Sequence, residues 1–178
     1  MGYMTLVMCP IFYPTKGGNV IKFEELADVK SESGVVASLI AEPNFLNFIE
    51  NLKGDDFTDR ANGVIYDAIC RLKEQDVVQI DAFNINTSIT GDAKLMKRAE
   101  GCLTPDIITQ IVDNAKFLAR GTSEEFVLCV NNVLAMAYKR KLYRDLNVAQ
   151  TRVLSAKSIT DIQRDVSDIL DSAADNYI

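Results

Sequence analysis

The chain contains no histidine among its 178 residues. This absence excludes catalytic triads and dyads that need an imidazole, and it excludes most catalytic zinc sites, which use histidine ligands. The chain also lacks any Gly-Lys dipeptide, which a P-loop needs so that its lysine reaches the outer phosphates of a nucleotide. We therefore predict a chain without catalytic, cofactor-binding or metal-binding residues.

Basic residues are outnumbered by acidic ones, 19 against 25, which gives a formal net charge of -6. A protein whose main task is to grip phosphates usually carries a basic surface. We therefore expect any contact of this chain with DNA to be indirect.

Cysteines are few and widely separated, and no two of them form the C-x-x-C pair of zinc knuckles and redox motifs. This pattern predicts free thiols in a reducing compartment. The apolar start of the chain, residues 1–13, is interrupted by Pro10, lacks a basic region, and is too short to cross a membrane. We expect a cytoplasmic protein that does not enter a membrane. The four cysteines are Cys9, Cys70, Cys102 and Cys129.

Residues 1–30 differ from the rest of the chain, because prolines and glycines mark turns between short apolar pieces. We predict a leader arm that lies against its own domain or against a neighbouring chain. From Ser31 the apolar spacing becomes helical and predicts a helical head over residues 31–121. Its first helix would be capped by Ser31 or Ser33 and stopped by Pro43.

The next segments of the head also show helical spacing. Residues 45–52 predict a short amphipathic helix that ends at Gly54, in the left-handed conformation common after helix ends. Thr58 or Asp59 would then cap a helix with an apolar face between residues 64 and 72.

The second half of the head has weaker signals. After a short extended run at 77–80, Asp81 would cap a brief helix, and residues 88–101 are polar and irregular. Thr104 followed by Pro105 predicts the start of a longer helix, because Pro is favoured at the first helical position. Its expected buried face consists of Ile107, Ile108, Ile111, Val112, Ala115 and Leu118.

A long helix follows Gly121. Thr122 and Glu125 fit a capping box, and neither glycine nor proline interrupts the run from Ser123 to Leu154. Such a helix would be about 45 Å long at ~1.5 Å per residue, so part of it must extend beyond the head. Its apolar stripe consists of Val127, Val130, Leu134, Tyr138, Leu142, Leu146, Ala149 and Val153.

A second helix begins after Ser158, so residues 122–178 are typical of an αα-hairpin. Two helices alone bury too little apolar surface to be stable, and we expect another copy of the chain to cover the exposed side. The inner face of the second helix consists of Ile159, Ile162, Val166, Ile169, Leu170 and Ala173.

A basic cluster at Lys139–Arg144 is flanked by tyrosines and has two interpretations. It is the best candidate for a recognition surface, with Arg140 and Arg144 one turn apart and opposite the apolar stripe. Alternatively, it is a solvated face that pairs with the aspartates of the second helix in an antiparallel hairpin.

Three segments give the chain a family resemblance. In order, Val35-Val36-Ala37-Ser38-Leu39-Ile40, Gly54-Asp55-Asp56-Phe57 and Val64-Ile65-Tyr66-Asp67-Ala68-Ile69 resemble the N-terminal domain of DnaB-type replicative DNA helicases. The resemblance runs from about Ser31 to Ser172. It implies an all-α fold, with a small helical head followed by a long C-terminal αα-hairpin, and a non-catalytic role in DNA replication.

The resemblance also implies partners. Heads and hairpins would pair into dimers, and three dimers would form a collar on a hexameric helicase. The hairpins would offer a surface to primase and in some cases to a helicase loader, while ATP and magnesium would bind the motor domain, which this chain lacks. The residues placed in or near these surfaces are Tyr138, Arg140, Leu142, Arg144, Leu146, Ile162 and Ile169.

Three features depart from the family pattern. The leader has no counterpart, residues 92–101 lack the usual Gly-Gly turn, and the ATPase domain is absent. We favour an excised N-terminal fragment of a helicase. One alternative is a free-standing phage or mobile-element regulator that mimics this domain and modulates a host helicase. Another is an unrelated helical enzyme or ligand-binding domain.

Overall fold

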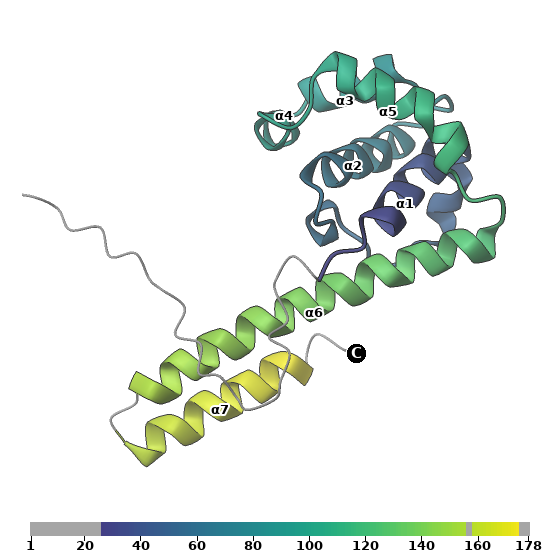
Figure 1. The fold of residues 1–178 in the computed structure, drawn as a ribbon. Helices are drawn as coiled ribbons and strands as arrows, with labels where there is room; N and C mark the ends of the chain where they lie inside the picture. Colours follow the sequence, from purple (N-terminus) through teal and green to yellow (C-terminus); the bar gives the residue numbers. More distant parts are fainter. Residues whose placement is uncertain (1–25, 156–157, 175–178) are drawn as a thin grey trace, which may run out of the picture.

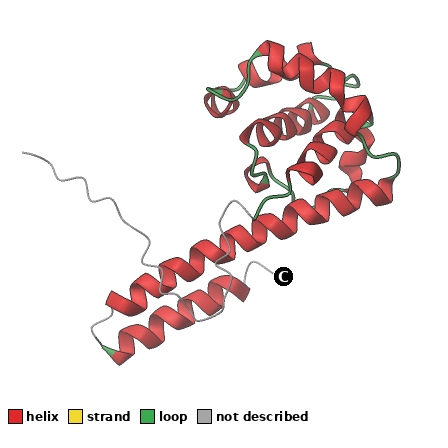
Figure 2. Ribbon diagram, in the orientation of Figure 1, coloured by secondary structure: helices red, strands yellow, loops and turns green. Residues whose placement is uncertain are grey.

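All regular structure is helical in the residues that the computed structural model describes, 26–155 and 158–174 (Figure 2). Most of the expected leader arm, residues 1–25, lies outside this part. In chain order the elements are α1 (Val29–Ala41), the 3₁₀ helices η2 (Pro43–Phe48) and η3 (Gly54–Asp56), α2 (Arg60–Glu74), α3 (Ala82–Thr90), α4 (Ala93–Ala99), α5 (Pro105–Leu118), α6 (Ser123–Ser155) and α7 (Ile159–Ala174).

The helices form a small head with a long projecting hairpin (Figure 1). Helices α1 to α5 gather over the first part of α6, which then continues beyond the head, and α7 folds back along it. With 33 residues, α6 is about 50 Å long at ~1.5 Å per residue. The predicted all-α head followed by an αα-hairpin is confirmed. The domain boundaries at residues 31 and 122 stay predictions.

Helix α2 is the centre of the head. Its predicted apolar face is buried, and α1, α3 and α4 pack around it. Fully burying one aliphatic side chain contributes about 1.5–3 kcal/mol, so this face accounts for much of the stability of the head. The first turns of α6 close the core from below, where Phe126 stacks on Phe45 with ring centroids 4.9 Å apart. The buried face of α2 consists of Val64, Ile65, Ala68, Ile69 and Leu72.

Gly54 does not end a helix in the left-handed conformation, so that prediction is wrong. It begins η3 and packs directly against α2. A Cβ atom on Gly54 would lie 2.2 Å from a carboxylate oxygen of Asp67 and 2.5 Å from the carbonyl oxygen of Gly63. The backbone N–H of Gly54 donates to Asp67 at 2.9 Å. Glycine is needed here for close approach between two backbones.

The first two predicted helices differ from the structure at their ends. Helix α1 begins at Val29, because Asp28 caps it by accepting hydrogen bonds from the N–H and the hydroxyl of Ser31. Ser31 therefore lies inside the helix rather than at its cap. The helix expected over 45–52 is the shorter η2, which starts with a proline at its first position and ends at Phe48.

The segment 88–101, predicted to be irregular, is mostly helical. Helix α3 extends to Thr90, and Asp92 caps α4 by accepting from the N–H groups of Lys94 and Leu95. Only Leu95 and Ala99 of α4 are buried. Seven residues span only about two helical turns, which is too short for a clear periodic pattern, so the sequence did not reveal this helix.

Helix α5 starts as predicted, with Thr104 accepting from the N–H of Ile107 at 3.3 Å and Pro105 at the first position. Asp81 also caps α3 as predicted. Helix α5 packs against α1 and α3, and its buried face is narrower than expected. Ile108 and Ala115 are buried, but Ile107 and Leu118 are exposed.

Candidate partner interface

Helix α6 carries five of the seven predicted interface residues. Thr122 caps it by accepting from the N–H of Glu125, and the Glu125 carboxylate accepts from the N–H of Gly121, one residue before the position that a capping box uses. Phe126, Cys129, Val130 and Val133 hold its first part in the core of the head. Beyond Arg140 no side chain of α6 is buried. The second part therefore lies outside the core of the head.

Helix α7 lies antiparallel to the second part of α6 (Figure 1). Ser158 caps it as predicted, accepting from the N–H of Asp161 at 3.1 Å and donating to its carboxylate at 2.7 Å. None of its described side chains is buried. The described side chains of α7 therefore differ from those of α2, which form the core of the head.

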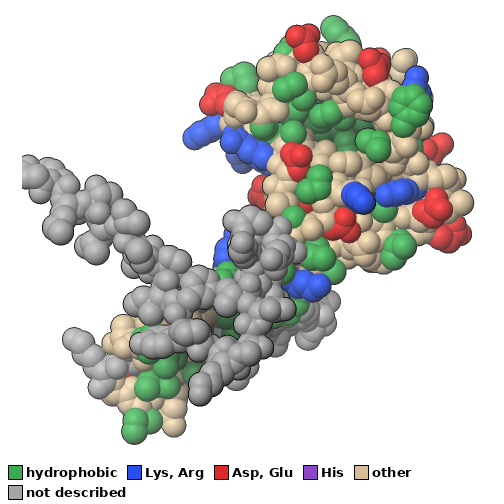
Figure 3. Space-filling view, in the orientation of Figure 1, with side chains coloured by type: hydrophobic (Ala, Val, Ile, Leu, Met, Phe, Trp, Pro, Cys, Tyr) green, Lys and Arg blue, Asp and Glu red, His purple; other side chains and the backbone are tan. Residues whose placement is uncertain are grey.

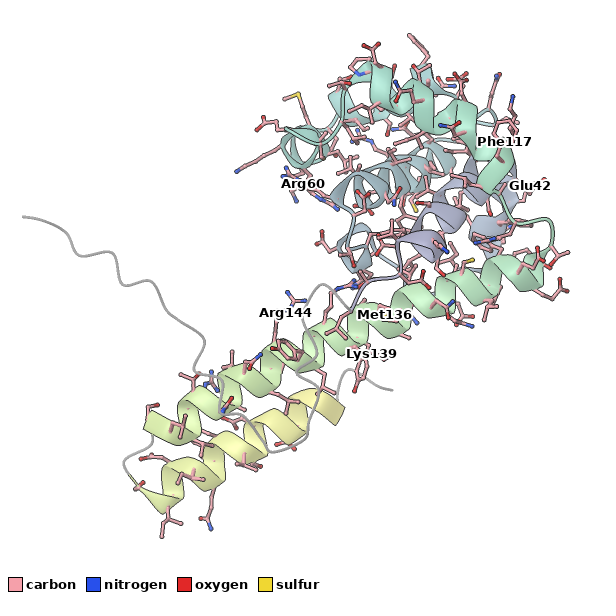
Figure 4. All side chains as sticks on the ribbon, viewed as in Figure 1. Glu42, Arg60, Phe117, Met136, Lys139 and Arg144 are labelled. Atoms are coloured by element: carbon pink, nitrogen blue, oxygen red, sulfur yellow. The ribbon has the colours of Figure 1, made fainter. Side chains whose placement is uncertain are left out.

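The structure places the predicted interface residues in different environments. Tyr138, Leu142 and Ile162 are half-buried, and Leu146 is 53% exposed. The side chain of Ile169 lies outside the described part. Figure 4 labels Arg144, also exposed, on α6 where it has left the head. Whether these residues contact a partner stays a prediction.

Arg140 is not on the exposed basic surface, and this part of the prediction is wrong. It is 6% exposed and points into the head, where its guanidinium donates to the backbone carbonyls of Leu26, at 2.7 Å, and Asp56. Helical spacing placed it opposite the apolar stripe, but the segments that contain Leu26 and Asp56 cover that side. Arg140 is therefore a contact between hairpin and head.

Asp56 belongs to the Asp-Asp-Phe segment that carries the family resemblance. Its carboxylate accepts from the N–H of Lys53 at 2.8 Å, while Asp55 forms an ion pair with Arg98 of α4 at 3.1 Å. Phe57 is buried in the core. The segment thus ties η3 to α4, to the core and, through a carbonyl, to α6.

The two interpretations of the basic cluster are only partly resolved by the ion pairs of α7. Arg164 lies 3.5 Å from Asp161 and 3.8 Å from Asp165, so two of the aspartates expected to face α6 have a local partner. Lys139 and Arg144 are exposed. The pairing of the cluster with α7 stays a prediction.

A shallow apolar hollow between η2 and the first turns of α6 was not predicted. Phe48 lies in the segment expected to form an amphipathic helix, but it is the last residue of η2 and is 53% exposed. The sequence signal was Leu128, an exposed apolar residue that lies off the predicted stripe of α6. The hollow has a volume of about 390 Å³ and is lined by Phe48, Ser123, Glu124, Val127, Leu128 and Asn131.

The cysteines of the head are free thiols, as predicted for Cys70, Cys102 and Cys129, while Cys9 lies outside the described part. Burial raises the pKa of Cys70 to about 11, so this group is a thiol at neutral pH. Across the described ranges, no three or more cysteine and acidic side chains gather as a metal site would require. None of the helices in these ranges combines the length and the apolar character needed to cross a membrane.

Comparison with known protein families gives one match. The model of the DnaB-like helicase N-terminal domain matches residues 24–120, which is more than half of the chain. The matched region ends just before α6, so it covers the head and leaves the hairpin outside. No curated protein and no solved structure matches the chain.

Proposed function

Because the chain belongs to the DnaB-like helicase N-terminal domain family, we propose that it is a non-catalytic assembly and docking module of a replicative DNA helicase. The observation that carries this proposal is the contrast between a well-packed head and a hairpin with exposed apolar side chains. The space-filling view shows hydrophobic side chains at the surface of the described hairpin (Figure 3). A surface of this kind favours association with another protein.

The hairpin surface supports self-association in particular. Leu146 is 53% exposed, Leu154 is 69% exposed, and Ile159 and Val166 of α7 are also exposed. Covering one large aliphatic side chain contributes up to about 1.5–3 kcal/mol. A second hairpin presents the same surface, so a two-fold axis would bury both copies of each side chain.

We propose the following partners for the assembled module. Paired chains form dimers, and three dimers form the collar of a hexameric helicase in the cytoplasm. The outer side of the hairpins docks primase, and in some assemblies a helicase loader. ATP and magnesium bind the motor domain of the helicase, and DNA contacts this module only indirectly.

The first test is the mass of the chain by light scattering over a concentration series, alone and with the cognate primase. We expect a dimer or a larger ring at micromolar concentration, and an added primase mass when primase is present. A monomer at every concentration would contradict the assembly role.

The matched variants place two carboxylates on the hairpin. Leu146→Asp with Leu154→Asp should dissociate the assembly, because unpaired carboxylates at a closed apolar contact lose their hydration. These positions are preferable to Leu142, which is half-buried within the chain itself. The control is Asn147→Asp with Gln150→Asp, which adds the same charge at exposed polar positions of the same helix. Equal dissociation of both variants would show a general charge effect.

The regulator alternative gives a different outcome in the same experiment. A chain that stays monomeric, yet adds its mass to a separately purified replicative helicase, would favour a free-standing modulator over a collar subunit. A chain that binds neither itself, primase nor helicase would contradict both functions.

A further inference from the structure

A buried arginine, Arg140, lies at the point where α6 leaves the head. Arg140 is the last buried residue of α6, two turns beyond Val133, the previous buried one. Figure 4 labels Met136, Lys139 and Arg144 on this stretch of the helix. Every side chain of α6 beyond Arg140 is half-buried or exposed. Arg140 is therefore the last residue of α6 that the head encloses.

The guanidinium of Arg140 joins two separate segments of the head. One nitrogen donates to the carbonyl oxygen of Leu26, just before α1, at 2.7 Å, and another donates to the carbonyl oxygen of Asp56, at the end of η3. A guanidinium is planar and presents its N–H groups in a fixed fork. Two acceptors on two segments therefore fix the direction of the side chain as well as its position.

A buried carboxylate completes the site. Glu32 of α1 is 1% exposed and accepts from the N–H groups of Thr58, at 2.7 Å, and Asp59, at 2.8 Å. Its charge attracts the guanidinium of Arg140 and partly opposes the effect of burial, which lowers the pKa of that arginine. Glu32 thereby links α1 to the segment just before α2 through two charge-assisted hydrogen bonds.

We propose that Arg140 is the positioning residue that holds the hairpin at a fixed angle to the head, through its hydrogen bonds to the carbonyls of Leu26 and Asp56. The angle matters for assembly because paired hairpins can arrange their heads uniformly only if each head has the same orientation. This consequence rests on the proposed function, whereas the angle itself is a property of the single chain.

Two variants of Arg140 distinguish the role of its planar guanidinium from the roles of its charge and its hydrocarbon stem. Arg140→Met keeps a long stem but removes both donors and the charge. Arg140→Lys keeps the charge, yet a single ammonium cannot reproduce the planar fork. Lys139→Met is the matched control, because it removes a neighbouring exposed charge from the same helix.

The measurement is the distance between spin labels on the head and on the hairpin, by double electron–electron resonance. Labels at the exposed positions Lys94 and Gln150 are introduced through unnatural amino acids, because the chain has native cysteines. Labelled chains are diluted into unlabelled ones so that only distances within one chain contribute. We expect one narrow distribution for the wild type and for Lys139→Met, and loss of that narrow peak for Arg140→Met and Arg140→Lys.

An unchanged narrow peak in both Arg140 variants would overturn the proposal. Circular dichroism checks that the head remains folded. If Arg140→Met unfolds, Arg140→Lys decides alone, because a wild-type distribution in that variant would show that the fork does not set the angle.

Light scattering then separates this inference from the proposed function. We expect the Arg140 variants to pair through their hairpins but to lose the uniform larger assembly. A wild-type chain that is always monomeric would contradict the assembly role, while the distance measurement would still test the role of Arg140. Variants that broaden the distance distribution yet assemble like the wild type would refute the link between the angle and assembly.

Discussion

The head and the hairpin consist of similar helices but differ in what stabilises them. In the head, α2 buries eight of its 15 residues against neighbouring helices. In the hairpin, none of the described side chains of α7 is buried, although its apolar residues are spaced regularly. Short isolated helices are marginal in water, so the head can be stable by itself, whereas the hairpin depends on further contacts. Helical spacing in the sequence therefore identifies the apolar face of a helix, but not the element that packs against that face.

The same difference in burial exists between the first and second parts of helix α6. Phe126 is fully buried in the head, while Leu146, five to six turns later, is 53% exposed. Phe126 lies outside the apolar stripe predicted for this helix. Val130, which is also buried, belongs to the stripe together with Leu146, so the helical spacing does not mark the change. The change occurs at Arg140, where the packing of the head ends.

The largest expected effect is on the free energy of unfolding, when one buried residue of the head and one exposed residue of the hairpin are each replaced by alanine. Leu39→Ala removes a fully buried side chain from α1 and should lower the free energy of unfolding of the head by about 2–5 kcal/mol, through lost burial and a cavity. Leu154→Ala, at 69% exposure in the hairpin, should change it by less than about 0.5 kcal/mol. Urea unfolding followed by circular dichroism, at a concentration below association, measures both. Similar losses of stability in the two variants would contradict the difference between the head and the hairpin.

A smaller effect is expected from the close contact between η3 and α2. In Gly63→Ala the new Cβ would lie 2.2 Å from the carbonyl oxygen of Gly54. Alanine favours helices by about 1 kcal/mol over glycine, but moving a backbone costs more, and we expect a net loss of about 1–3 kcal/mol. Gly121→Ala is the control, because its Cβ would have no neighbour closer than 3.9 Å. The same unfolding measurement applies, and a stabilised Gly63→Ala variant would contradict the packing described.

The smallest effect concerns the first cap of the head. Asp28→Ala removes the acceptor for the N–H of Ser31 and should cost about 1 kcal/mol at neutral pH. The hydrogen bonds from the hydroxyl and the N–H of Ser31 hold the pKa of Asp28 below its ordinary value of 3.8. Its contribution to stability is therefore complete above that value and is lost as the pH falls through the lower pKa of the folded state.

Urea midpoints of the wild type and Asp28→Ala measure this effect. The two midpoints should differ at pH 7 and converge as the solution is acidified below about pH 4, since protonation removes the same acceptor that the substitution removes. A difference that stays constant with pH would show that the carboxylate charge has no part in the cap.

Helices with a long apolar face were predictable, and those held by few contacts were not. The face of α2 and the length of α6 followed from spacing, and the caps at Asp81, Thr104 and Ser158 followed from local chemistry. Helix α4 was missed because it buries only two residues. The cap of α1 was misplaced because Ser31 is a good cap in isolation, but here it donates to Asp28.

The candidate site was predictable in location but not in detail. The stripe of α6 indicated a hairpin, and the family resemblance indicated what such a hairpin would bind. Helical spacing also assigned Arg140 to the surface. The spacing within one helix cannot show which distant segments of the chain cover its other side. The contacts of Arg140 with Leu26 and Asp56 span 114 and 84 residues of sequence.

The sequence by itself determined that the chain is all-α, that its head and hairpin follow in that order, and that no histidine or P-loop chemistry is available. These properties follow from composition and from the 3.6-residue period, which are local. The tertiary structure alone decided which side of each helix is covered, why Gly54 and Gly63 must lack side chains, and where the hairpin leaves the head. Those properties depend on distances between segments far apart in the chain, which no local pattern contains.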